Sequence, residues 1–101
     1  MRLYIDTSDR EKITIGLDEK KFTANAKEKA SQKLLAFIEK ILKKEGVLIN
    51  QITQIEVHTG PGSFTGLRVG VSVANAIGWA LGIPVNGKNI RKGESTDIGY
   101  T

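Results

Sequence analysis

The feature that most constrains the fold of this chain is a glycine-rich stretch at residues 60–82. It opens with Gly-Pro-Gly, which predicts a tight turn because glycine supplies unusual backbone angles and proline fixes its own. Ser63 or Thr65 then suits the N-cap of a helix, and Gly82 and Pro84 are typical of its end. The stretch therefore predicts a turn followed by a helix of about five turns.

The predicted helix has small residues along one row and apolar residues almost all round. The row recurs at every fourth position: Gly66, Gly70, Ala74, Gly78 and Gly82. Glycine inside a helix costs about 0.5–1 kcal/mol relative to alanine, so a helix with several should gain from the close approach of another backbone. A helix that is apolar on most sides must also be buried on several sides. Two explanations stay open: tight packing inside one domain, or packing of one flank on this chain and of another on a partner chain.

Alternation and helical periodicity predict the remaining elements. Strands are expected at residues 2–6, 12–18, 20–26, 52–58 and 83–86, and helices at residues 28–45 and 64–81. The order βββαβαβ predicts an α/β fold with a five-stranded mixed sheet, in which right-handed crossovers place both helices on one face. Residues 1–86 would form this domain, and residues 87–101, which lack periodicity, would form a polar, flexible tail.

The predicted strands are apolar at every second position only. The positions expected to face the helices are Leu3, Ile5, Ile13, Ile15, Leu17, Phe22, Ala24, Ile55 and Val57. A sheet covered on both faces would have continuous apolar strands instead. The pattern therefore predicts two layers, with helices on one face of the sheet and water on the other.

Composition limits the classes of function. The chain has 101 residues, enough for one modest core, and its 40% hydrophobic and 26% charged residues are ordinary for a soluble protein. It has no opening segment of signal-peptide type and no membrane-length apolar run, so we expect a cytoplasmic protein without membrane contact. It has no cysteine, which excludes disulfides and thiolate chemistry. The net charge of +4 comes from lysines scattered among glutamates, which favours a solvated basic surface over a nucleic-acid-binding module.

Asp6, Thr7 and Ser8, at the end of the first strand, are the candidates for a cofactor site, because a carboxylate and two hydroxyls could meet a phosphate-bound metal. A local Asx-type turn is the favoured alternative. The glycine turn could bind an anion through backbone N–H groups, but it lacks the lysine of a phosphate-binding loop. His58, the single histidine, is expected to be an exposed structural residue, and Ser31 has no base nearby in sequence. No catalytic residue, metal site or cofactor is therefore predicted.

Three segments together resemble the TsaB (YeaZ) family. They are Asp6-Thr7-Ser8, the Ser-Gln-Lys-Leu-Leu sequence at residues 31–35, and the nine-residue run at residues 60–68, which is highly specific. The resemblance covers residues 2 to about 86 and implies one lobe of the actin/Hsp70-like ATPase superfold, a ribonuclease H-like half. Family members usually have a second lobe, and nucleotide binds between lobes, so no nucleotide site is expected in this chain. The family also commonly has histidine before the serine of the first helix, where this chain has Ala30.

The resemblance implies a non-catalytic partner in the formation of threonylcarbamoyladenosine in tRNA. In that pathway the paralogous enzyme TsaD transfers the threonylcarbamoyl group and a small ATPase, TsaE, assists, so contact with tRNA would be only indirect. Family members pair with the enzyme, or with themselves, through the helices that correspond to residues 28–45 and 64–81. The metal-binding histidine pair of TsaD has no counterpart here. The expected interface residues are Leu34, Ile38, Leu42, Gly66, Val69, Gly70, Val73 and Ile77.

Two other functions stay open from the residues alone. A small enzyme that handles ATP or phosphate would use Asp6 and the glycine turn. A self-associating one-lobe module would use the same pair of helices without an enzyme partner. The one-sided sheet favours a natural minimal lobe over a cut fragment.

Overall fold

The structure is a computed structural model that describes residues 1–27, 29–94 and 96–97. Its strands are β1 (Arg2–Asp6), β2 (Lys12–Leu17), β3 (Lys20–Asn25) and β4 (Gln54–Val57), and its α-helices are α1 (Ala30–Glu45) and α2 (Phe64–Leu81). Of two 3₁₀ turns, η1 (Ile49–Gln51) lies between α1 and β4, and η2 (Ile90–Lys92) follows α2. Residue 28 of the predicted first helix and residues 95 and 98–101 of the predicted tail lie outside the described residues.

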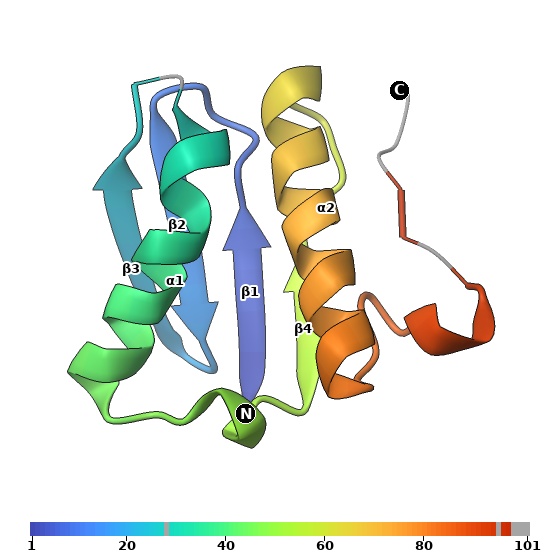
Figure 1. Cartoon of the computed structure of the whole chain (residues 1–101). Coiled ribbons are helices and arrows are strands. Elements are labelled where there is room, and N and C mark those ends of the chain that lie inside the picture. Colours follow the sequence, from blue (N-terminus) through green and yellow to red (C-terminus); the bar gives the residue numbers. More distant parts are fainter. Residues whose placement is uncertain (28, 95, 98–101) are drawn as a thin grey trace.

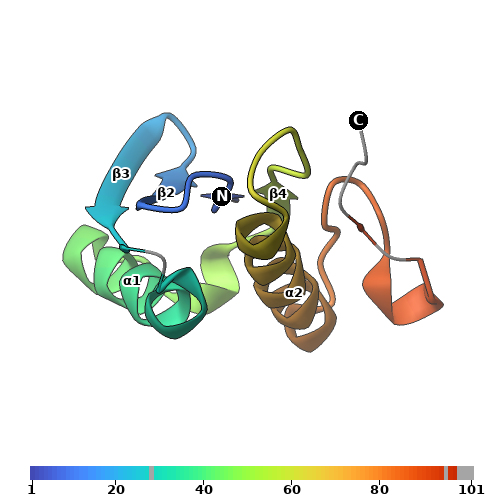
Figure 2. The same ribbon diagram turned by 90° about the horizontal axis from the view of Figure 1, so that it is seen from above.

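The strands form one mixed sheet in the order β3-β2-β1-β4, in which only the β1–β4 pair is parallel (Figure 1). Both α-helices cover the same face of this sheet (Figure 2). Under the helices, the side chains of Leu3, Ile5 and Ile13 are fully buried, whereas Thr14 and Thr23 on the opposite face are partly or well exposed. The predictions of an α/β class, a mixed sheet and helices on one face are therefore confirmed.

The predicted fifth strand at residues 83–86 is wrong for the described chain, whose sheet has four strands. Val85 alone forms a bridge to β4, opposite Ile55. The Ile55 amide donates a hydrogen bond to the carbonyl of Pro84 at 2.9 Å. One bridge is too short to count as a strand.

The physical reason lies at Asn86, where a side chain takes the place of strand backbone. The Val57 amide donates to Asn86 Oδ1 at 2.8 Å, and Asn86 Nδ2 donates to the Val57 carbonyl at 3.0 Å. Asn86 and Gly87 both have positive φ, and Val85 and Lys88 exchange two backbone hydrogen bonds across them. The chain therefore reverses in a two-residue hairpin turn before a fifth strand can form.

Helix α2 begins, and both α-helices end, where sequence rules place their caps, whereas Lys29 before α1 makes no side-chain cap hydrogen bond. The Ser63 hydroxyl at the N-cap of α2 accepts a hydrogen bond from the Gly66 amide. Gly46 after α1 and Gly82 after α2 are both left-handed, with φ of 67° and 68°. Helix α2 matches its predicted range of 64–81.

The glycine row of α2 faces the interior of this chain. A Cβ placed on Gly70 would lie 2.5 Å from Thr7 Oγ1, and one on Gly66 would collide with the Thr7 carbonyl oxygen. At Gly78, an added Cβ would collide with the side chain of Val85. Of the two explanations for the glycine row, close packing inside the domain is therefore the one observed at these positions.

Residues 87–94 and 96–97 lie along the side of α2 that faces away from α1 (Figures 1 and 2). Thr96 is buried, and its hydroxyl donates to the Val85 carbonyl at 2.9 Å. Asn75 of α2 donates to the Thr96 carbonyl at 2.9 Å. The division into a lobe and a flexible tail stays a prediction. None of the described helices is long and apolar enough to cross a membrane.

Candidate functional site

The three cofactor candidates at the end of β1 hold the start of α2 in place. The Thr7 side chain is 1% exposed, and its hydroxyl donates to the Gly66 carbonyl at 2.5 Å. Asp6 Oδ1 accepts hydrogen bonds from the Ser8 amide at 2.9 Å and from the Ser8 hydroxyl at 2.6 Å. This is the Asx-type turn that the local sequence favours.

The glycine turn is fastened to the same segment. The Ser63 amide donates to the Ser8 carbonyl at 3.0 Å, and Gly62 sits so close to Ser8 that a side chain there would meet it. His58, expected to be exposed, is half-buried, and its Nε2 lies 3.0 Å from the Pro61 carbonyl oxygen. The Gly-Pro-Gly turn is thus held from both sides and fixes where α2 begins.

Tyr4 is the one described group in this region with a resolved pKa shift. Partial burial raises the pKa of its phenol above the ordinary value of 10.0, and the nearby Asp6 carboxylate raises it further. The phenol donates a long hydrogen bond of 3.4 Å to Asp6 Oδ2. Tyr4 is therefore neutral at physiological pH and lies on the open face of the sheet, away from the helices.

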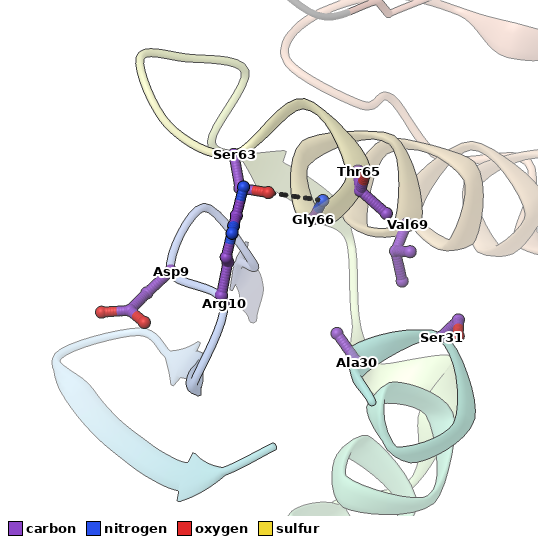
Figure 3. Close-up of a pocket in the computed structure, with 8 residues that line it drawn as sticks. All are labelled: Asp9, Arg10, Ala30, Ser31, Ser63, Thr65, Gly66 and Val69. Atoms are coloured by element: carbon purple, nitrogen blue, oxygen red, sulfur yellow. Dashed lines mark hydrogen bonds between the residues drawn. The ribbon is translucent and has the colours of Figure 1, made fainter. Parts of the chain in front are cut away.

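A cavity of about 340 Å³ lies between the N-terminal ends of α1 and α2 (Figure 3). Its polar lining includes Arg10, Ser31, Ser63 and Thr65, whose guanidinium and hydroxyl groups are of the kind that donates hydrogen bonds to an anion. Asp9 lines the same cavity, and its carboxylate would repel an anion. Ala30 also lines it, at the position where the resembled family commonly has histidine. None of the cofactor candidates at residues 6–8 contributes to the lining.

A second hollow, which we call the helix-pair groove, lies between the C-terminal halves of α1 and α2. It has a volume of about 360 Å³ and a lining that is almost wholly apolar. The lining residues are Leu35, Ile38, Glu39, Leu42, Ile49, Ile77, Ala80 and Leu81. Leu35 and Ile49 are 53% and 43% exposed, which leaves large apolar side chains open to solvent at its edge.

The eight predicted interface residues fall into two groups. Leu34, Ile38, Leu42 and Gly70 are buried in the core of the chain, whereas Gly66, Val69, Val73 and Ile77 are partly exposed. Ile38 and Leu42 reach the floor of the helix-pair groove, and Ile77 lines its α2 side. Gly70 lies against Thr7 and is not available to a partner helix. Whether the rest form an interface stays a prediction.

Sequence reasoning missed Leu35, Ile49 and Leu81 as lining residues of the groove. The sequence did contain a signal for Leu35. It is an apolar residue next to Leu34 that lies outside the buried apolar stripe of α1, and such a residue indicates an exposed apolar surface. Ile49 could not be found in this way, since it comes from the short η1 turn that follows α1. Its place beside the helices depends on how the chain returns to β4.

Comparison with known proteins matches the part of the chain that contains the first helix and the glycine turn. Residues 23–89 match the family described as "TsaD: tRNA N6-adenosine threonylcarbamoyltransferase". The TsaB protein named for tRNA threonylcarbamoyladenosine biosynthesis in Buchnera aphidicola subsp. Schizaphis graminum is 29% identical over 84% of this chain and 42% of its own length. The protein of the same name from Haemophilus influenzae is 36% identical over 54% of this chain and 23% of its own.

Solved structures of YeaZ proteins have a similar fold. YeaZ from Pseudomonas aeruginosa superposes on 83% of this chain and 41% of its own, with a TM-score of 0.73 and 26% sequence identity. The fold, with its helix pair on one face and its glycine turn, is thus an α/β lobe of the kind found within YeaZ. The chain belongs to the TsaB/YeaZ family. It spans less than half of the length of these relatives.

Proposed function

We propose that this chain takes part in the formation of threonylcarbamoyladenosine in tRNA as a non-catalytic partner subunit. The helix-pair groove would dock onto a TsaD-like threonylcarbamoyltransferase, and a second copy of the chain would compete for the same groove. A TsaE-like ATPase would act in the same pathway, and contact with tRNA would be indirect. The observation that carries this proposal is the exposed apolar groove in a chain that belongs to the TsaB/YeaZ family.

The groove has the physical character of a docking surface. Apolar side chains line both of its walls, and Glu39 is the one charged residue in its lining. Covering exposed apolar side chains such as Leu35 would contribute about 25 cal/mol per Å² of buried surface. Because Ile38 and Leu42 of the floor are already packed in the core, the partner would find a rigid surface and little ordering would be needed.

The residues near the glycine turn support a structural role over a catalytic one. Asp6 is engaged by Ser8, Thr7 by Gly66, and His58 lies against Pro61. A catalytic group has to reach its substrate, and these groups hold the turn that fixes α2 instead. We therefore assign the polar residues at the end of β1 to building the docking lobe.

The test is a charge placed in the groove. Leu35→Asp would bury an unpaired carboxylate in any complex, next to Glu39, so we expect at least a hundredfold loss of affinity for a purified TsaD-like enzyme, equivalent to about 3 kcal/mol. The matched control is Ala36→Asp, which adds the same charge at an exposed α1 position outside the groove lining. Binding is measured by isothermal titration calorimetry. Equal affinity of the two variants would contradict docking through this groove.

The cavity between the helix N-termini supports a second candidate function, the handling of a phosphate group. Arg10 and Ser31 line this cavity, whereas Asp6 does not, so the cavity residues replace Asp6 as the ones to test. A rise in melting temperature on addition of ATP or inorganic phosphate, abolished by Arg10→Ala, would favour this function. No rise would contradict this function.

A further inference from the structure

The last turn of α2 is completed by an arginine from a later part of the chain. Arg91, in η2, donates from Nε to the Trp79 carbonyl at 2.6 Å and from Nη2 to the Ala80 carbonyl at 2.9 Å. The last carbonyls of a helix lack partners within the helix, and its C-terminal end attracts positive charge. Helix α2 has no basic residue in its own last turn, so Arg91 supplies what its sequence lacks.

Several contacts hold Arg91 in this position. Its guanidinium lies over the indole ring of Trp79, 5.8 Å from the ring centroid. It also passes so close to Gly82 that an added Cβ there would lie 2.8 Å from Arg91 Nη1. Within the segment that carries Arg91, residues 87–94, the Glu94 carboxylate accepts a hydrogen bond from the backbone amide of Asn89. Thr96 ties the far end to Val85 and to Asn75 of α2, so the segment is fastened at both ends.

This segment lies mostly outside the part of the chain that defines the family, because the family match ends at residue 89. It nevertheless reaches the docking surface through one link. Ala80, whose carbonyl Arg91 holds, lines the helix-pair groove together with Leu81. The segment therefore contacts the last turn of α2 on one side, and the groove is lined by the other side of the same turn.

We propose that residues 87–94, anchored by Thr96, act as a strap that fixes the last turn of α2 through Arg91 and so sets the affinity of the helix-pair groove for its partner. The inference rests on the proposed function, since it concerns the regulation of the same groove. In the closed strap, Arg91 is bound to the carbonyls of Trp79 and Ala80. This closed strap holds Ala80 and Leu81 in the arrangement that the partner binds. By linkage, partner binding stabilises the closed strap by the same factor.

The isolated chain tests whether Arg91 fixes the last turn of α2. Arg91→Ala should raise the hydrogen-exchange rates of the Gly82 and Ile83 amides, which close the end of α2 on the Gly78 carbonyl, by about tenfold. Trp79 is the single tryptophan, so quenching of its fluorescence by iodide should also increase. The matched control is Lys92→Ala, which removes the same charge from the neighbouring position of η2. Unchanged exchange in Arg91→Ala would overturn the strap, whatever the groove binds.

The effect of the strap on the affinity of the groove is tested by calorimetric titration of the same variants with a purified TsaD-like enzyme. Self-association is measured by light scattering. Arg91→Ala should weaken binding by about fivefold or more, and Lys92→Ala should not. Thr96→Val, which removes the hydroxyl bond to Val85 without touching the end of α2, gives a second loosened strap if Arg91→Ala fails to fold. Faster exchange with unchanged affinity would overturn the coupling. A wild-type chain that binds neither the enzyme nor itself would overturn the docking proposal and the coupling, while the exchange result still judges the strap.

Discussion

Gly70 of α2 lies where a methyl group would collide with the side chain of Thr7. Glycine to alanine inside a helix normally stabilises by about 0.5–1 kcal/mol. Here the new Cβ would lie 2.5 Å from Thr7 Oγ1 and 3.5 Å from side chains of Ile5 and Val57, so α2 would have to move away from the sheet. We expect Gly70→Ala to destabilise the chain by about 1–3 kcal/mol instead.

Urea unfolding followed by circular dichroism measures this change. Ser72→Ala is the control on the same helix, because residue 72 is exposed and should shift stability by no more than about 0.5 kcal/mol. A Gly70→Ala variant as stable as the wild type would mean that the glycine row is not packed against β1. The row would then be available to a partner helix.

The pair Leu34 and Leu35 shows what residue-level pattern can and cannot reveal. The helical period of α1 correctly placed Leu34, Ile38 and Leu42 on one apolar face. It could not tell whether that face meets the sheet or a partner, since both surfaces are apolar. The structure buries this face in the core, although Ile38 and Leu42 also form the floor of the helix-pair groove. Leu35, one position further round the helix, stays exposed at the edge of the groove.

At the scale of the element, this difference makes a prediction about the two sides of α1. Leu34→Ala removes a side chain with no exposure and should cost about 2–5 kcal/mol of unfolding free energy. Leu35→Ala truncates the same side chain where it is 53% exposed and should cost less than about 1 kcal/mol in the monomer. Chemical denaturation at low protein concentration compares the two. Similar losses would mean that Leu35 is packed inside the monomer and is not part of an open groove.

The strands and helices were more predictable than the connection after α2. Strand β1 and helix α2 match their predicted ranges, because alternation, caps and glycine turns act locally and agree with one another. The fifth strand failed because the apolar residues at positions 83 and 85 alternate as in a strand, while Asn86 replaces backbone pairing with its side-chain amide. This replacement of backbone hydrogen bonds by a side chain requires Asn86 to lie beside Val57 in the fold, and no local sequence pattern contains that information.

At the scale of the whole molecule, the chain is small and has an apolar groove on the same side as both helices. A domain of this size buries a modest fraction of its surface, so its stability should respond strongly to any protein that covers the groove. The open face of the sheet is different in character. It carries the Arg2–Glu56 ion pair and Lys21 stacked over Tyr4, which suit contact with water.

The last prediction concerns what covers the groove when no enzyme is present. If a second copy does so, the mass measured by light scattering should rise from monomer to dimer with concentration. The melting temperature should then increase by roughly 5 °C or more over a hundredfold range of concentration, because dimerisation stabilises the folded state by mass action. Leu35→Asp should remove both effects and Ala36→Asp neither. A wild-type chain that stays monomeric with a constant melting temperature would show that the groove does not bind its own kind, and the enzyme would then meet it without competition.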